Sequence, residues 1–153
     1  MIQRLSHEDI PQVCNLLLTL HEESTAFGTH PIDRQYVEAH LEGMILNHNA
    51  IMLGSYAENT LQGVMFGVVG AQWYSPRLEA YEMLLAVFPE YRGSSVAYRL
   101  IKEFERESLV LGAEAITVGS SLNIADATAV KLYNRLGYSH AGTGLTKRIV
   151  HNV

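Results

Sequence analysis

The sequence predicts one α/β (α+β) domain with a mixed sheet, spanning residues 1–153. Three observations predict this class. The length is that of a single domain. The hydrophobic spacing changes from helical to strand-like and back, which gives the order β-α-α-β-β-β-α-β-α-β. Three central strand-like runs are joined by short turns, as in an antiparallel meander, and a right-handed β-α-β crossover is expected to follow them.

The first third of the chain is predicted to hold one short strand and two helices. Residues 2–5 form an edge-like strand, and Ser6 with Asp9 is typical of a helix start. Residues 21–31 are polar and end in helix breakers, so they predict a loop, and Asp33 starts the second helix. The apolar positions of the first helix recur at helical spacing: Ile10, Val13, Leu17 and Leu20.

The middle of the chain is predicted to form the meander. Strands are expected over residues 51–56, 63–72 and 78–87. Turns are expected at residues 58–60 and 74–76, where Asn, Thr, Ser and Pro gather. The apolar run from Tyr81 to Val87 in the last of these strands is expected to be buried.

The last third is predicted to form a helix, a strand, a helix and a strand. An amphipathic helix stops at Gly112, and residues 115–118 read as a short buried strand. Asp126 caps the next helix, which stops at Gly137, and residues 138–150 read as a last strand or hairpin. The apolar positions of the amphipathic helix are Val96, Leu100, Ile101, Phe104 and Leu111.

Composition and charge exclude several classes of protein. The chain is 48% hydrophobic and 18% charged, with a net charge of −5 and no basic run, which disfavours a nucleic-acid or anionic-membrane partner. The first residues do not read as a signal peptide, and no apolar run approaches the roughly 20 residues of a membrane helix. We therefore expect a cytoplasmic protein.

The metal-binding and redox classes are also disfavoured. Cys14 is the single cysteine, so no internal disulfide or thiolate zinc site can form, and it is expected in the core of the first helix. The seven histidines are scattered singly, without the spacing of a zinc protease. Walker, Rossmann and nucleophile-elbow motifs are not found. We expect no metal cofactor.

The stretch VFPEYRGSSVAYRL, residues 87–100, places small residues and an arginine between a buried strand and a helix. At such a turn several main-chain N–H groups have no partner within the helix. They converge where the helix dipole also favours an anion, so a diphosphate fits the position. The alternative is a tight turn that happens to be built of small residues.

This layout resembles the GNAT superfamily of acyl-CoA N-acyltransferases, whose cofactor motif is Arg/Gln-x-x-Gly-x-Gly/Ala. Arg92 and Ala97 match that motif, and Ser95 stands where the motif has glycine. A second family segment matches as Ala129-x-x-Leu132-Tyr133-x-x-x-Gly137-Tyr138, with Asp126 where an asparagine is common. Residues 142–149 look like the family's last strand. The resemblance covers nearly the whole chain and implies a mostly antiparallel central sheet flanked by helices.

The resemblance implies acetyl-CoA (coenzyme A) as co-substrate. The main-chain N–H groups of residues 93–97 would bind its pyrophosphate, with Arg92 adding charge nearby; the alternative for Arg92 is a surface arginine. The backbone of residues 85–87 would run beside the pantetheine arm. A β-bulge in this strand would turn an N–H toward the thioester carbonyl. The implied cofactor-binding residues are Leu85, Ala86, Val87, Arg92, Gly93, Ser94, Ser95, Val96, Ala97, Asp126 and Tyr133.

The implied reaction is attack of a neutral primary amine on the thioester within a ternary complex. Tyr133 would protonate the leaving thiolate, and the rate should then fall at high pH as the phenol ionises; the alternative is a packing role in its helix. Glu82 would take the proton of the amine, directly or through a water. Glu79 is a second candidate base. For both Glu82 and Glu79, the alternative is a side chain on the solvated face of an outer strand end, with no role in the reaction. His21 and His30 are outside candidates.

Two functions follow from the sequence. The first is an N-acetyltransferase that acts on a small-molecule amine or a protein amine. The second is a catalytically degenerate acyl-CoA-binding or regulatory module of the same fold, motivated by Ser95 and Asp126. The identity of the amine and the formation of a homodimer are left open.

Overall fold

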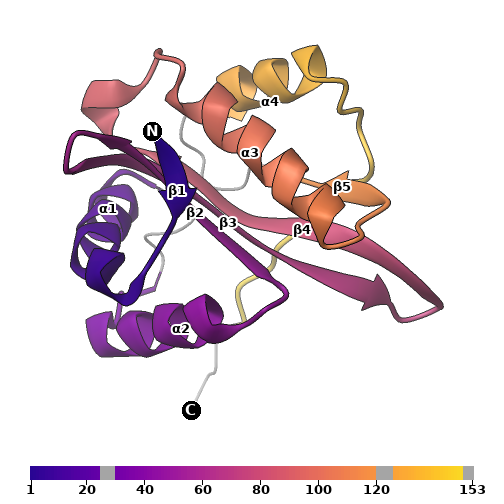
Figure 1. Ribbon diagram of the computed structural model, residues 1–153, viewed down its shortest axis with the longest axis horizontal. Helices are drawn as coiled ribbons and strands as arrows, with labels where there is room; N and C mark the ends of the chain where they lie inside the picture. Colours follow the sequence, from indigo (N-terminus) through magenta and orange to yellow (C-terminus); the bar gives the residue numbers. More distant parts are fainter. Residues whose placement is uncertain (25–29, 120–125, 150–153) are drawn as a thin grey trace.

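The computed structural model describes residues 1–24, 30–119 and 126–149 of the chain. These residues form a five-stranded sheet in the order β1-β2-β3-β4-β5, with helices on both faces (Figure 1). Short 3-10 turns precede α1 and follow β4, over His7–Asp9 and Pro89–Tyr91. The elements are β1 (Ile2–Arg4), α1 (Ile10–Glu23), α2 (Arg34–Leu46), β2 (Ala50–Ala57), β3 (Thr60–Gln72), β4 (Ser75–Val87), α3 (Val96–Val110), β5 (Ala115–Thr117) and α4 (Asp126–Arg135).

The sheet opens between β4 and β5. Strands β1 to β4 pair antiparallel in chain order, whereas β5 lies parallel to β4. The β4–β5 pairing begins at Glu79 with Ala115 and ends at Tyr81 with Thr117. Beyond that point, residues 82–87 of β4 pair, within the described part of the chain, with β3 alone. One edge of this part of β4 is therefore bare, as the family resemblance implies.

The start of the bare edge carries a β-bulge. Phe66 of β3 pairs with Leu84 of β4, but the next residue, Gly67, pairs with Glu82. Met83 is therefore an extra residue on β4, which bends the strand and increases its local twist. The expected bulge in this strand is confirmed, and it follows directly after Glu82.

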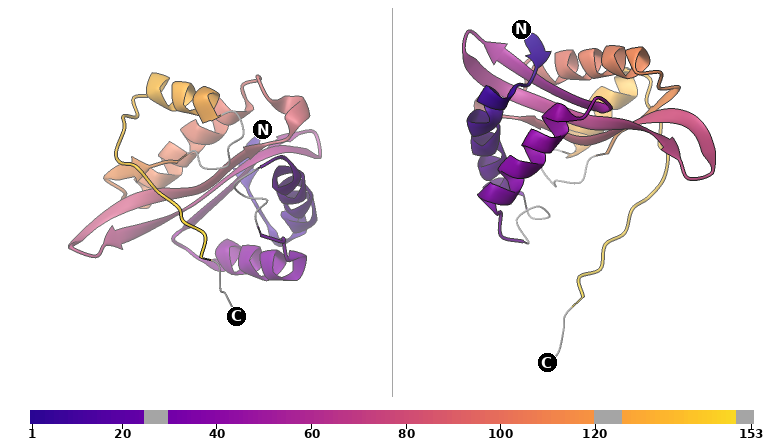
Figure 2. Two further views of the ribbon diagram at one scale, coloured as in Figure 1. Left: turned by 180° about the vertical axis from the view of Figure 1, so that it is seen from behind. Right: turned by 60° about the horizontal axis from the view of Figure 1, so that its bottom comes forward.

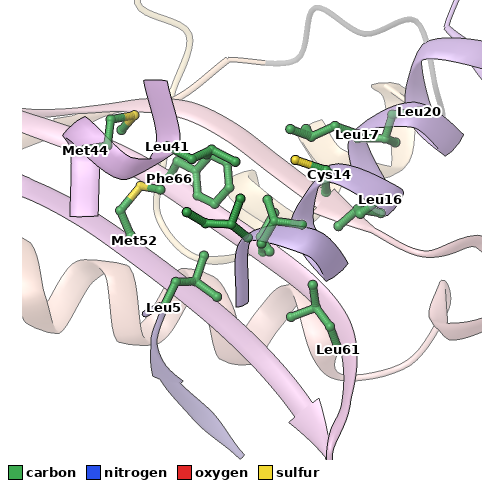
Figure 3. Packing of buried hydrophobic residues seen from close by; sticks show 14 of the residues in the cluster. Leu5, Cys14, Leu16, Leu17, Leu20, Leu41, Met44, Met52, Leu61 and Phe66 are labelled. Atoms are coloured by element: carbon green, nitrogen blue, oxygen red, sulfur yellow. The ribbon is translucent and has the colours of Figure 1, made fainter. Parts of the chain in front are cut away.

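Two hydrophobic clusters hold the helices on the sheet. Helices α1 and α2 cover one face, and α3 and α4 cover the other (Figure 1). Figure 3 shows the first cluster, to which Cys14 of α1, Leu41 of α2 and Met52 of β2 all contribute. Successive residues of a strand point to opposite faces, so Leu53, next to Met52, belongs to the second cluster. The predicted core position of Cys14 is confirmed.

Phe104 of α3 packs closely on β3 at the bulge. A Cβ atom on Gly67 would lie 2.4 Å from the Phe104 ring and 2.5 Å from the Tyr81 carbonyl oxygen. Glycine is therefore needed here for the helix to approach the sheet. The contact fixes α3 beside the open part of β4.

Most predicted elements are confirmed, with shifted ends. The Asp33 side chain accepts a hydrogen bond from the Tyr36 N–H at 3.0 Å, as expected of a helix start. Helix α1 continues to Glu23, and β4 already begins at Ser75, where a turn was predicted. No helix among the described residues is long and apolar enough to cross a membrane.

Two predictions for the C-terminal third are wrong. Residues 139–149 form no strand, and the segment leaves the body of the protein in an extended path (Figure 2, right). The expected buried strand at β5 is instead an edge strand with Ala115 and Thr117 exposed. Both segments have strand-like sequences, but a strand also needs a hydrogen-bonded neighbour. Residues 139–149 pair with no strand among the described residues, and the outer edge of β5 is left unpaired there.

Candidate active site

The turn between β4 and α3 presents several free donors. Gly93 has φ +78, which favours glycine, and a Cβ atom there would meet nothing within 4 Å. The N–H groups of Gly93, Ser94, Ser95 and Ala97 have no acceptor among the described residues. With the N-terminus of α3 behind them, these donors form a site suited to an anion.

Ser95 is compatible with this turn although glycine is usual in the family. Its φ is −80, so the position requires no left-handed backbone. The neighbouring Ser94 hydroxyl donates to the Tyr91 carbonyl oxygen at 2.5 Å. It also accepts the Val96 N–H at 3.3 Å, so Val96 is not a free donor as the sequence implied.

Arg92 is held by the protein itself. Its two terminal nitrogens donate to the Glu23 carboxylate of α1 at 2.7 and 3.0 Å, and its Nε donates to the Val87 carbonyl oxygen at 3.0 Å. The Arg92 hydrogen bonds lower the pKa of Glu23, so this pair is charged at neutral pH. Arg92 therefore joins α1, the end of β4 and the turn, and it is neither a free cation nor a plain surface residue.

A pocket of about 160 Å³ lies along this turn and the bare edge of β4. It brings together most of the residues that the resemblance assigns to coenzyme A: Leu85, Ala86, Val87, Arg92, Gly93, Ser94 and Ala97. The opposite wall is α4, and Leu20 of α1 and Tyr91 complete the lining. Thr128, Ala129 and Leu132 of α4 were not assigned, although Ala129 and Leu132 belong to the second family segment. Ser95, Val96 and Tyr133 do not line the pocket, and the side chain of Asp126 lies outside the described part of the chain.

Glu82 lies on β4 directly after Tyr81, the residue at which the pairing with β5 ends. Its carboxylate accepts the Gly119 N–H, just beyond β5, at 2.8 Å, and also the Leu85 N–H. Burial raises the pKa of Glu82, while these two hydrogen bonds lower it by less, so the net shift is upward. A carboxylate with a raised pKa is suited to accept a proton near neutral pH.

Tyr133 of α4 carries a buried hydroxyl group and borders a hollow together with Gly119. The hydroxyl has no hydrogen-bond partner among the described residues, although it is fully shielded from solvent. Burial raises the pKa of Tyr133 strongly, and the nearby charges of Glu82 and Tyr138 raise it further. The Glu82 carboxylate is thus near enough to Tyr133 to raise the pKa of the phenol, which is protonated at neutral pH. A buried polar group without a partner is costly, so it is expected to bond to a ligand.

The other candidate bases lie elsewhere. Glu79 accepts hydrogen bonds from Gln72 at 2.8 Å and Tyr81 at 3.2 Å, beside the paired part of β4. His21 Nε2 donates to the His30 carbonyl oxygen at 2.5 Å, and neither histidine lines the pocket. Among the predicted bases, Glu82 is the one that the structure places near Tyr133.

Comparison with known protein families shows to which family the domain belongs. The family described as "Acetyltransferase (GNAT) domain" matches residues 55–140, more than half of the chain. The chain belongs to the GNAT acetyltransferase family. No curated protein sequence matches it.

Solved structures share the GNAT fold at low identity. An aminoglycoside acetyltransferase from an uncultured soil metagenomic sample has a TM-score of 0.73 and 22% identity over 98% of both chains. A transcriptional regulator from Bacillus halodurans C-125 has a TM-score of 0.80 and 12% identity, over 97% of this chain and 99% of its own. A ribosomal-protein-alanine N-acetyltransferase from Brucella melitensis biovar Abortus 2308 has a TM-score of 0.72 and 15% identity over the same shares. These similarities show the fold.

Two contacts of this GNAT site were missed from the sequence. Glu23 lies 69 residues before Arg92, and Gly119 lies 37 residues after Glu82, so no local pattern joins either pair. The resemblance did indicate Arg92 and Glu82 themselves. Their partners follow from how α1 and the end of β5 pack beside β4.

Proposed function

We propose that this GNAT domain transfers an acetyl group from acetyl-CoA to a primary amine by direct attack in a ternary complex. The observation that carries the proposal is the continuity of the pocket with the Glu82–Tyr133 pair. Leu85 lines the pocket and donates its N–H to Glu82, and Gly119, the other donor to Glu82, borders a neighbouring hollow together with Tyr133. A ligand extended along the bare edge of β4 would therefore end beside both groups.

The residues present fit coenzyme A. The free N–H groups of Gly93, Ser94, Ser95 and Ala97 would bind its pyrophosphate, and the open space at Gly93 leaves room for it. The bare edge of β4 would pair with the amides of the pantetheine arm, as an added strand would. Arg92, through Glu23 and Val87, would hold the turn in position. When bound, acetyl-CoA supplies the acyl group as a thioester.

Glu82 and Tyr133 would handle the two protons of the reaction. An amine with a pKa of ~8 to ~10.4 is mostly protonated at neutral pH, so a base must accept its proton. Glu82, with its raised pKa, would do so directly or through a water. The Tyr133 hydroxyl would donate to the leaving sulfur. Because its pKa is raised, this phenol is better suited to donate a hydrogen bond than to give up its proton completely.

The second candidate, a degenerate acyl-CoA-binding module, has less support. It rested on Ser95 and Asp126, and the φ of −80 at Ser95 removes the concern about backbone strain there. Asp126 remains as a departure from the family pattern. The raised pKa of the partly buried Glu82, and the Tyr133 hydroxyl without a partner among the described residues, favour turnover over a pure binding module.

The acceptor amine is proposed only as a class. The similar structures include aminoglycoside acetyltransferases, one in complex with sisomicin, and a ribosomal-protein-alanine N-acetyltransferase, so small polyamines and protein N-termini are both to be tested. The net charge of −5 weakly favours a cationic acceptor. A cytoplasmic location stays a prediction.

The test is an acetyl-CoA assay with a panel of amines, with release of free thiol as the readout. Aminoglycosides, simple polyamines and short peptides with free N-termini form the panel. Release above the rate without amine supports the transferase. Binding of acetyl-CoA without release for any amine favours the degenerate module.

A further inference from the structure

The outer part of the β3–β4 hairpin projects beyond the rest of the sheet (Figure 1). Strand β2 pairs with β3 no further than Val68, and β5 pairs with β4 only from Glu79 to Tyr81. The hydrophobic cluster under α1 and α2 includes no residue of β3 after Val68 and none of β4 before Leu84. On this side of the sheet, the outer hairpin is therefore covered by no helix among the described residues.

Three polar side chains meet on this uncovered face. Successive residues of a strand point to opposite faces, and Ala80 packs under α3 and α4, so its neighbours Glu79 and Tyr81 point the other way. The Gln72 amide of β3 donates to the Glu79 carboxylate at 2.8 Å and also to the Tyr81 hydroxyl. The Tyr81 hydroxyl in turn donates to the same Glu79 oxygen at 3.2 Å. Two neutral donors thus fix this carboxylate, and its second oxygen stays free among the described residues.

Glu79 has no cationic partner in the part of the chain that the structure describes. Arg77, two residues earlier on β4, pairs with Glu114 at 3.5 Å instead. The carboxylate is therefore held in place without being neutralised. Charge complementarity favours a cation that comes from outside the protein.

Two exposed aromatic rings lie beside this carboxylate. Trp73 is 94% exposed and Tyr74 is 68% exposed, and their rings pack edge to face with centroids 5.4 Å apart. Desolvation and the hydrogen bond to Glu79 raise the pKa of Tyr81, and the nearby Tyr74 adds to this shift, so the pair adjoins the polar group. An ammonium group is attracted to the face of an aromatic ring, most strongly to that of tryptophan. Together these residues form what we call the hairpin cluster: Gln72, Trp73, Tyr74, Glu79 and Tyr81.

The hairpin cluster lies within reach of the candidate catalytic pair. Glu79 is three residues before Glu82, which corresponds to about 10 Å along a strand. Glu82 lies near Tyr133 of α4, on the other face of the sheet. The sheet opens directly after Tyr81, where the pairing with β5 ends. A slender molecule on the Glu79 face can therefore pass the bare edge of β4 and present one end to Glu82.

We propose that the hairpin cluster is a subsite for a second cationic group of the acceptor. The preferred acceptor would then be a small polyamine, with a second ammonium group about 10 Å from the nitrogen that is acetylated. The second ammonium would donate to the free oxygen of Glu79 and lie against the Trp73–Tyr74 rings. This inference rests on the proposed function and names the class of amine for the same site.

The first test measures binding without catalysis. Trp73 is the single tryptophan of the chain, so its fluorescence reports directly on the hairpin cluster. An eight-carbon chain with an amine at each end should change this fluorescence and saturate, whereas the uncharged eight-carbon diol should not. Glu79→Gln should raise the dissociation constant of the diamine roughly 3- to 10-fold. Glu58→Gln, which removes the same charge from the exposed turn between β2 and β3, should leave it unchanged.

The second test measures the preference of the enzyme, with acetyl-CoA as donor. The eight-carbon diamine should have a lower KM than the eight-carbon monoamine, beyond the statistical effect of its two amines. Glu79→Gln should raise KM for the diamine roughly 3- to 10-fold and retain kcat with both amines. Trp73→Leu, at an exposed position outside the core, should raise the same KM roughly 2- to 5-fold. Circular dichroism checks that each variant is folded.

The outcomes separate this subsite from the proposed function. Equal diamine binding by wild type and Glu79→Gln overturns the subsite, and so does turnover without a preference for the diamine; the acetyltransferase function survives both results. A loss of kcat with both amines in Glu79→Gln would make Glu79 a base and would also overturn the subsite. Diamine binding that depends on Glu79, with no thiol release for any amine, would keep the subsite and overturn acetyl transfer.

Discussion

Replacing Tyr133 by phenylalanine is expected to make the protein more stable and less active. The change keeps the ring, which packs against Tyr138 with centroids 5.2 Å apart, and removes the hydroxyl. That hydroxyl is buried without a hydrogen-bond partner, a state that costs about 1–3 kcal/mol. At the low end of this range, removal should raise the melting temperature by about 2–4 °C for a domain of this size.

The effect on the reaction is expected in the opposite direction. A hydrogen bond to a charged group contributes about 1.5–3 kcal/mol, so its loss at the leaving sulfur should lower kcat by roughly 10- to 150-fold. Affinity for acetyl-CoA should change little, since the pocket is lined by other residues. The sequence alone predicted a fall in the wild-type rate at high pH; the raised pKa of Tyr133 moves that fall beyond the range where it can be observed.

The assay combines thermal melting, acetyl-CoA titration and steady-state kinetics with the best amine of the panel. A variant that melts lower and keeps the wild-type kcat would refute the reasoning. Tyr133 would then be a packing residue, and the sulfur would be stabilised by another group or by water.

The remaining predictions concern four other positions and the cofactor. Acetyl-CoA at 100 times its dissociation constant should stabilise the fold by about 2.7 kcal/mol in thermal melts, and ATP should not do so comparably. Glu82→Gln should lower kcat and remove the acidic limb of the pH–rate profile. Because the folded pKa of Glu82 is raised, its ionisation lowers stability as pH rises, so the stability of Glu82→Gln relative to wild type should grow in melts as the pH rises above 4.5, the ordinary pKa of this carboxyl group. Gly93→Asp should abolish acetyl-CoA binding in calorimetry with the fold intact, whereas Ser95→Gly should bind as wild type does; normal binding by Gly93→Asp would place the pyrophosphate elsewhere. Gly67→Ala should cost about 1–3 kcal/mol in urea unfolding, because the new methyl group meets the Phe104 ring.

The local features of the fold could be predicted because each rests on neighbouring residues. Asp33 starts a helix through its own side chain, and Gly93 adopts the positive φ that the turn requires. The meander strands follow from hydrophobic runs and turn residues. The anion site follows in the same way, since it is built from one turn and the first residues of one helix.

The missed features depend on packing between distant segments. The Arg92–Glu23 pair joins α1 to the turn between β4 and α3, and nothing in the sequence near Glu23 indicates a partner 69 residues away. The prediction of a last strand was wrong for a related reason. Residues 139–149 have the alternating apolar pattern of a strand, but this pattern does not indicate which segment would pair with it. Strand pairing depends on two segments, so the sequence of one segment is not enough to predict it.

Under the proposed function, the opened sheet would link the lifetime of the protein to the supply of its acyl donor. Residues 82–87 of β4 give up one side of their hydrogen-bonded ladder, so this region depends on a ligand for part of its order. A ligand that binds only the folded state lowers the population of opened forms that a protease can cut. We expect limited proteolysis of the free protein to slow markedly when acetyl-CoA is added. In a cell, the abundance of such an enzyme would then rise and fall with its donor, without any dedicated regulator.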